Sequence, residues 1–78
     1  GLKVAIAYPN PGKDVLNIRT GLQNAQVEIY DLSGKLIHKQ QITDNITPIT
    51  TTSWPSGTYI WKVMSNGKVT ESGKWIKE

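Results

Sequence analysis

Few side chains in this sequence could carry out chemistry, and the most reactive types are nearly absent. The 78 residues include one histidine, His38, and no cysteine. A zinc site built from cysteine and histidine within one chain is therefore excluded, and a Ser-His-Asp triad would have to use His38. This histidine falls among lysine and glutamines in a segment expected to form a strand. We interpret it as a solvated strand residue and expect no catalytic residue and no metal site.

The acidic residues do not indicate a glycosidase. Such an enzyme needs two carboxylates facing each other about 5–10 Å apart across a cleft, and a domain of this size has little volume for one. Each glycine stands alone at a turn signal, so the sequence has no glycine-rich phosphate loop. Turn and surface roles account for the acids, and we expect neither an enzyme nor a cofactor. The acids are Asp14, Glu28, Asp31, Asp44, Glu71 and Glu78.

Charge and hydropathy argue against nucleic acid and membrane partners. The formal net charge is +3, and the lysines are scattered rather than gathered in the dense stripe that nucleic-acid binding needs. No run approaches the ~20 apolar residues of a transmembrane helix, so we expect no direct membrane insertion. The chain starts at Gly1 without a methionine, which indicates a fragment of a longer protein.

The three tryptophans, Trp54, Trp61 and Trp75, allow two interpretations. An exposed row of them could stack against sugars, which would make the domain a carbohydrate-binding or adhesive module of a secreted enzyme. Alternatively, large aromatic side chains fill a core that contains no phenylalanine. Trp61 is expected in the core and Trp54 at one end of it, whereas the position of Trp75 stays open.

The elements that must position these residues are short strands. Turn signals recur at short intervals, and the segments between them are rich in β-branched and aromatic residues, which is typical of a sandwich or barrel. We predict one domain over residues 1–78, an all-β, immunoglobulin-like antiparallel sandwich of about seven strands. The strands are expected at residues 4–8, 14–20, 25–32, 35–42, 46–52, 58–65 and 68–76.

Prolines, glycines and one aspartate mark the expected corners. Two prolines flanking Asn10 fix two φ angles and remove two donors, which predicts a rigid corner. Asp31 can accept a bond from a backbone N–H ahead of it, and Gly34 can adopt the positive φ that closes a hairpin. Gly73, inside the last strand, marks a candidate bulge. The residues assigned structural roles are Pro9, Asn10, Pro11, Asp31, Gly34, Gly57 and Tyr59.

Five blocks of the sequence, in order, resemble the C-terminal sorting domain (type A) of the Bacteroidetes type IX secretion system. Each block is weak alone, but together they span nearly the whole chain. Trp54 stands where leucine is usual, and Trp75 lies in a tail strand that is usually aliphatic. The blocks are Tyr8-Pro9-Asn10-Pro11, residues 14–18, residues 27–35, Pro55-Ser56-Gly57-Thr58-Tyr59-Ile60 and Lys74-Trp75-Ile76-Lys77.

The resemblance implies a function in sorting rather than catalysis. Such domains follow an N-terminal cargo domain in the same chain, cross the periplasm, and direct the cargo to the outer membrane, the cell surface or the medium. An outer-membrane shuttle barrel binds them, and a sortase-like protease often removes them. The family's last strand is held to be important for export. The partner-recognition residues are accordingly expected to be Gly73, Lys74, Trp75, Ile76 and Lys77.

The last strand also suggests how recognition would work. A terminal edge strand offers unpaired backbone groups that a partner can pair by strand addition. Lys74 and Lys77 would point to opposite faces of a flat strand, and a bulge at Gly73 or a frayed tail would turn both outward. Alternatively, both lysines are gatekeepers against aggregation. An inert spacer between domains is a further alternative for the whole chain.

Overall fold

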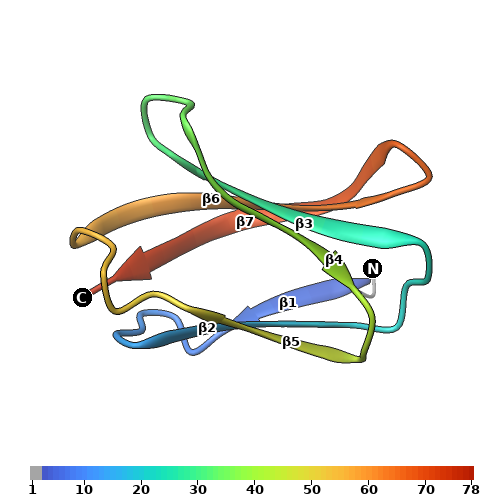
Figure 1. Cartoon of the computed structure of the whole chain (residues 1–78), viewed down its shortest axis with the longest axis horizontal. Helices are drawn as coiled ribbons and strands as arrows, with labels where there is room; N and C mark the ends of the chain where they lie inside the picture. Colours follow the sequence, from blue (N-terminus) through green and yellow to red (C-terminus); the bar gives the residue numbers. More distant parts are fainter. Residues whose placement is uncertain (1–2) are drawn as a thin grey trace.

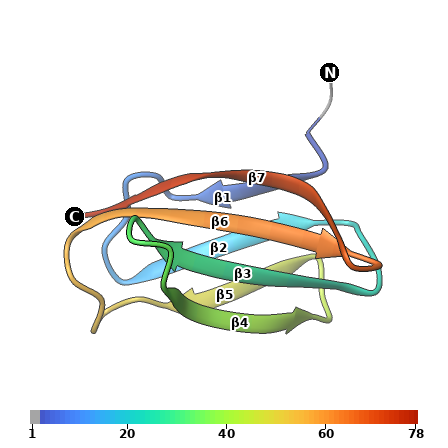
Figure 2. The same cartoon turned by 90° about the horizontal axis from the view of Figure 1, so that it is seen from above.

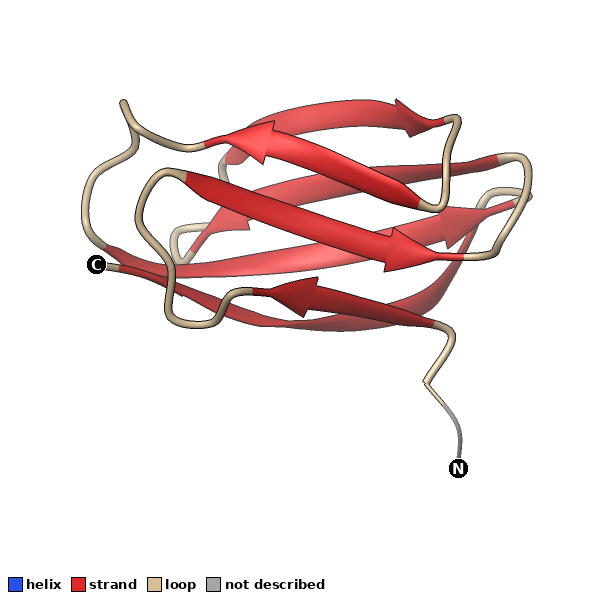
Figure 3. Cartoon of the chain, turned by 90° about the horizontal axis from the view of Figure 1, so that it is seen from below, coloured by secondary structure: helices blue, strands red, loops and turns tan. Residues whose placement is uncertain are grey.

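The computed structural model describes residues 3–78 and confirms the all-β prediction, with seven strands in two antiparallel sheets (Figure 1). The smaller sheet has the order β1 (Ala5–Tyr8), β2 (Val15–Thr20) and β5 (Ile46–Thr50). The larger has the order β4 (Leu36–Ile42), β3 (Ala25–Asp31), β6 (Gly57–Ser65) and β7 (Lys68–Lys77). Figure 1 shows the sheets stacked face to face, and Figures 2 and 3 show the loops at the two ends of the strands.

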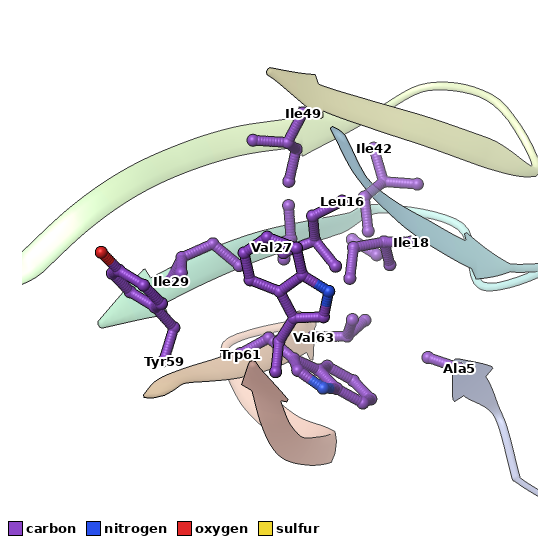
Figure 4. Close-up of a cluster of buried hydrophobic side chains, with 12 residues drawn as sticks. Ala5, Leu16, Ile18, Val27, Ile29, Ile42, Ile49, Tyr59, Trp61 and Val63 are labelled. Carbon is purple, nitrogen blue, oxygen red and sulfur yellow. The ribbon is translucent and has the colours of Figure 1, made fainter. Parts of the chain in front are cut away.

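The core forms where the inward faces of the two sheets meet. Leu16 and Ile18 alternate with polar residues on β2 and are fully buried, as the period-two pattern of a strand requires. Central strand β6 contributes three buried side chains from alternate positions. Figure 4 shows this cluster between the sheets. Its members are Ala5, Leu16, Ile18, Ala25, Val27, Ile29, Ile42, Ile49, Tyr59, Trp61, Val63 and Trp75.

The turn between β3 and β4 follows from Asp31 and Gly34, as predicted. The Asp31 carboxylate accepts bonds from the Ser33 hydroxyl and from the backbone N–H groups of Ser33 and Lys35. The Ser33 hydroxyl and then the Lys35 N–H lower the pKa of Asp31. Because folding lowers this pKa, ionisation of Asp31 stabilises the folded turn fully at pH values above the carboxyl's ordinary pKa range. This stabilisation is lost as the pH falls through the lowered pKa.

Replacing Gly34 with valine is expected to lower the free energy of unfolding by about 1–3 kcal/mol. The φ of Gly34 is +89°, which a β-branched residue rarely adopts. An added Cβ would meet no atom within 4 Å, so the cost comes from the backbone alone. Urea unfolding measures it, with Gly21→Val as the matched control, because Gly21 has open space and no positive φ. Equal stability of the two variants would contradict this account of the turn.

A second corner, at residues 53–57, is held by Tyr59. This buried tyrosine donates its hydroxyl hydrogen to the Pro55 carbonyl at 2.6 Å, as in the tyrosine corner of immunoglobulin-like sandwiches. Burial, and then the Asp31 carboxylate, raise the pKa of Tyr59, so it stays a donor at neutral pH. Gly57 has a φ of +150° at the start of β6. Both residues thus lie at the corner that leads into β6.

The bulge expected at Gly73 lies elsewhere, and this part of the prediction was wrong. Gly73 pairs in regular register with Trp61, whereas the register of β6 and β7 shifts between Val63 and Met64, where Thr70 is skipped. Gly73 serves a different purpose, because a Cβ there would lie 2.9 Å from the Trp61 indole ring. Glycine is needed so that the indole can pack against the backbone of β7.

Residues 3–78 contain no helix that is long and apolar enough to cross a membrane. Within the same residues, no group of three or more His, Cys, Asp and Glu side chains is placed to hold a metal ion.

Candidate functional site

The residues expected to be recognised by partners lie on β7, an edge strand of the larger sheet. Its single neighbour is β6, which pairs with it from Gly57↔Lys77 to Ser65↔Lys68. The other side of β7 faces β1 of the smaller sheet, and Figures 1 and 2 both show these two strands side by side. β1 belongs to the other sheet and does not pair with β7, so no strand is hydrogen-bonded to this side of β7. We call it the open side, and the strand-addition hypothesis requires such a side.

The expected recognition residues do not share one surface. Lys74 and Ile76 are exposed, and Ile76 keeps 48% of its side-chain accessibility. Trp75 and Lys77 alternate with them and point inward, with Trp75 fully buried and Lys77 9% exposed. The sequence analysis expected opposite faces for the two lysines in a flat strand, and an outward turn of both only with a bulge at Gly73 or a frayed tail. The strand stays regular from Gly73 to Lys77, so the lysines keep the opposite faces that alternation dictates.

Trp75 is the internal anchor of β7. Its ring packs edge-on against Trp54, with centroids 6.1 Å apart, and lies 6.2 Å from Tyr59. Its indole N–H donates to the Pro9 carbonyl at 2.6 Å. These positions favour core filling over an exposed sugar-binding surface for the three tryptophans, because Trp61 and Trp75 are buried and Trp54 is half-buried. They form no exposed row for sugar stacking.

The corner after β1 covers the C-terminal part of the open side of β7, from Lys74 onward. We refer to this as the lower part and to the preceding residues as the upper part. We call residues 9–12 the strap. Within it, the Asn10 side chain donates to the Lys74 carbonyl at 2.8 Å and accepts from the Ile76 N–H at 3.0 Å. The Gly12 N–H donates to the Ile76 carbonyl at 2.9 Å, and the Glu78 N–H donates to the Gly12 carbonyl at 2.8 Å. The strap thus replaces a neighbouring strand over residues 74–78.

Gly12 allows the strap to approach so closely. A Cβ at this position would lie 2.9 Å from both the Pro9 carbonyl oxygen and the Trp75 ring. The peptide bonds that precede Pro9 and Pro11 are cis. Sequence reasoning treated Pro9, Asn10 and Pro11 as a corner and missed that Asn10 binds the last strand. The partners lie 64 and 66 residues apart, and no local pattern connects them.

Replacing Asn10 with alanine is expected to lower the free energy of unfolding by about 1–2 kcal/mol, since two hydrogen bonds are lost. Hydrogen exchange at the Ile76 amide is expected to accelerate, because that N–H bonds to the Asn10 side chain. NMR-detected exchange measures the effect. The control is Asn17→Ala on β2, whose side chain makes no hydrogen bond among residues 3–78. Unchanged protection at Ile76 would show that the strap does not hold β7.

The upper part of the open side of β7 stays unpaired. Along an antiparallel strand, alternate residues direct both backbone groups to the same side. Ile76 directs its N–H and C=O to the strap, so Lys74 and Ser72 direct theirs the same way. Among residues 3–78, the Ser72 N–H and C=O and the Lys74 N–H have no partner there. These three groups are the ones that strand addition would use.

Comparisons with known proteins find one family model that covers most of the chain. A family model described as "Secretion system C-terminal sorting domain" matches residues 6–78, which include all seven strands except the first residue of β1. No curated protein matches the chain.

Proposed function

The chain belongs to the family of secretion-system C-terminal sorting domains, and on that premise we propose that its partners recognise the open edge and exposed face of β7. The family is the sorting signal of type IX secretion. Its members are attached to a cargo protein, act with that secretion system, and send the cargo to the cell surface or outside. A sorting domain of this kind is not catalytic.

The observation that carries the proposal is that inward and outward residues of β7 have different roles. The inward residues Trp75 and Lys77 fix the strand to the sandwich, whereas Lys74 and Ile76 face solvent. Gly73 lets β7 lie against Trp61, and the strap holds the lower edge in place. A partner would thus meet a rigid strand with outward side chains and free backbone groups, which suits recognition of one module on many cargoes.

The finer steps of the route belong to the same proposal. Residues 1–78 would act as a single module behind an N-terminal cargo domain, and the parent protein would pass through the periplasm. An outer-membrane shuttle barrel would bind the β7 edge, and a sortase-like protease would then act on the parent chain. The exposure of β7 supports the first contact, because an exposed edge strand offers unpaired backbone groups to a partner.

Fusing residues 1–78 to a periplasmic reporter in a type IX-competent strain tests the function, and surface labelling of the reporter measures export. The wild-type fusion is expected to reach the surface, and the variant Lys74→Glu/Ile76→Ser is expected to reach it poorly. Both replaced side chains are exposed, so the variant should melt like the wild type. The control is Lys39→Glu/Ile46→Ser, which alters exposed residues on other edges. Full export of the β7 variant would contradict the assignment.

A further inference from the structure

A groove lies between β1 and the upper part of β7, beside the unpaired backbone groups. Its volume is about 290 Å³, and its lining includes Ala5 and Ala7 from β1, Ser72 and Lys74 from β7, and Trp61 beneath them. Next to the lining residues Ala5 and Ser72, the Val4 N–H donates to the Glu71 carboxylate at 3.1 Å and so links β7 to the residue before β1. One end of the groove is closed by the strap at Asn10. The groove therefore spans the part of β7 that has no neighbour.

The walls of the groove suit the backbone of an extended peptide. Ala5, Ala7, Ser72 and Gly73 are small, so a chain can approach β7 closely. Gly73 carries no side chain over Trp61, which leaves the indole ring as the floor. A strand placed here would pair with the Ser72 N–H and C=O and with the Lys74 N–H, and so extend the larger sheet.

The polar groups of the groove favour an acidic side chain. The two charged residues in its lining are Lys3 and Lys74, and both are exposed. The Trp61 indole nitrogen would lie 2.9 Å from a Cβ on Gly73, and it makes no hydrogen bond among residues 3–78. In that part of the chain every buried side-chain nitrogen and oxygen is bonded, so solvent must reach this N–H. The lining of the groove thus holds two lysines and no carboxylate, and the Glu71 carboxylate beside it is engaged by the Val4 N–H.

We propose that this groove binds an extended segment of a partner protein whose acidic side chain, aspartate or glutamate, is attracted by Lys3 and Lys74, with the Trp61 indole ring lining the groove beneath the segment. The proposal rests on the sorting function and specifies the chemistry of the segment that β7 recognises. Backbone pairing at Ser72 and Lys74 gives the segment its direction along the groove. The carboxylate supplies selectivity, because charge-assisted hydrogen bonds are stronger than neutral ones.

A peptide titration tests the proposal on the isolated 78-residue chain. The probe is acetyl-Thr-Val-Glu-Val-Thr-amide, added to ¹⁵N-labelled protein, and peptides with glutamine or lysine in place of glutamate are the controls. The glutamate peptide is expected to shift the Trp61 indole signal and the Ser72 and Lys74 amides. The glutamine peptide should bind on the order of fivefold more weakly. No shift at these signals, or equal binding of all three peptides, would overturn the proposal.

Charge-reversal variants separate the lysines from the rest of the surface. The double variant Lys3→Glu/Lys74→Glu is expected to weaken binding of the glutamate peptide on the order of tenfold, and added salt should remove the difference. Lys39→Glu, on the opposite edge of the same sheet, is the control and should bind normally. Equal binding by the double variant and the control would show that the lysines do not hold the carboxylate.

Export of the reporter fusion distinguishes this proposal from the sorting function itself. If the wild-type fusion is exported and Lys3→Glu/Lys74→Glu is exported equally well, the acidic-segment proposal fails while the sorting function stands. If the wild-type fusion stays inside the cell, the proposed function fails, whatever the peptide titration gives.

Discussion

Replacing Trp75 with alanine is expected to lower the free energy of unfolding by about 3–5 kcal/mol. The side chain is fully buried, packs against Trp54 and Tyr59, and donates to the Pro9 carbonyl. A domain of 78 residues has a total stability of about 4–12 kcal/mol, so this loss removes much of the margin. Urea unfolding followed by circular dichroism measures it, because that signal does not depend on the number of tryptophans.

The matched control is Trp54→Ala, which removes the same side chain from a half-buried position. Its cost is expected to be less than half that of Trp75→Ala, because less apolar area returns to water. A second comparison, Trp75→Phe, keeps much of the packing but loses the bond to Pro9. If Trp75→Ala proves no less stable than Trp54→Ala, Trp75 does not anchor β7.

Deleting residues 73–78 is expected to abolish export of a fused reporter and leave it in the periplasm. The deletion removes Trp75 from the core and the partners of the strap, and it strips β6 of its neighbour from Gly57 to Trp61. The domain is therefore expected to lose its cooperative unfolding transition as well. Surface labelling and circular dichroism measure the two effects. Full surface yield of the truncated protein would contradict recognition through β7.

The deletion alone does not separate recognition from folding, because the same residues serve both. The separation comes from Lys74→Glu/Ile76→Ser, which alters outward side chains only. That variant is expected to fold and yet be exported poorly. A loss of export with the deletion, but full export with the point variant, would mean that the secretion machinery needs a folded domain and does not contact these side chains.

Local patterns predicted the strands and most turns, because their causes lie within a few residues. The strand expected at residues 14–20 is observed at Val15–Thr20, and Asp31 and Gly34 form the turn between β3 and β4. Each of these signals is read from neighbouring positions, which is why the sequence alone was sufficient.

The candidate site was less predictable, because it depends on contacts between distant segments. The strap joins Asn10 to Lys74 and Ile76, and the groove joins β1 to β7, with no periodic signal for either. Gly73 was interpreted as a candidate bulge because glycine inside a strand often marks one, whereas the glycine is needed because of the Trp61 ring on the next strand. The burial of Lys77 could have been predicted, since it shares the parity of Trp75.

The strap has a consequence for the order in which the domain assembles. The hydrogen bonds of the strap join Pro9 and Asn10 to Lys74 and Trp75. A loop of more than sixty residues must therefore close before these bonds form. Contacts of such long range slow folding and make it all-or-none. A polypeptide still emerging from a ribosome or a membrane channel therefore has no finished sandwich until Trp75 has arrived. Completion of the domain thus reports that the chain has been delivered at least as far as Trp75.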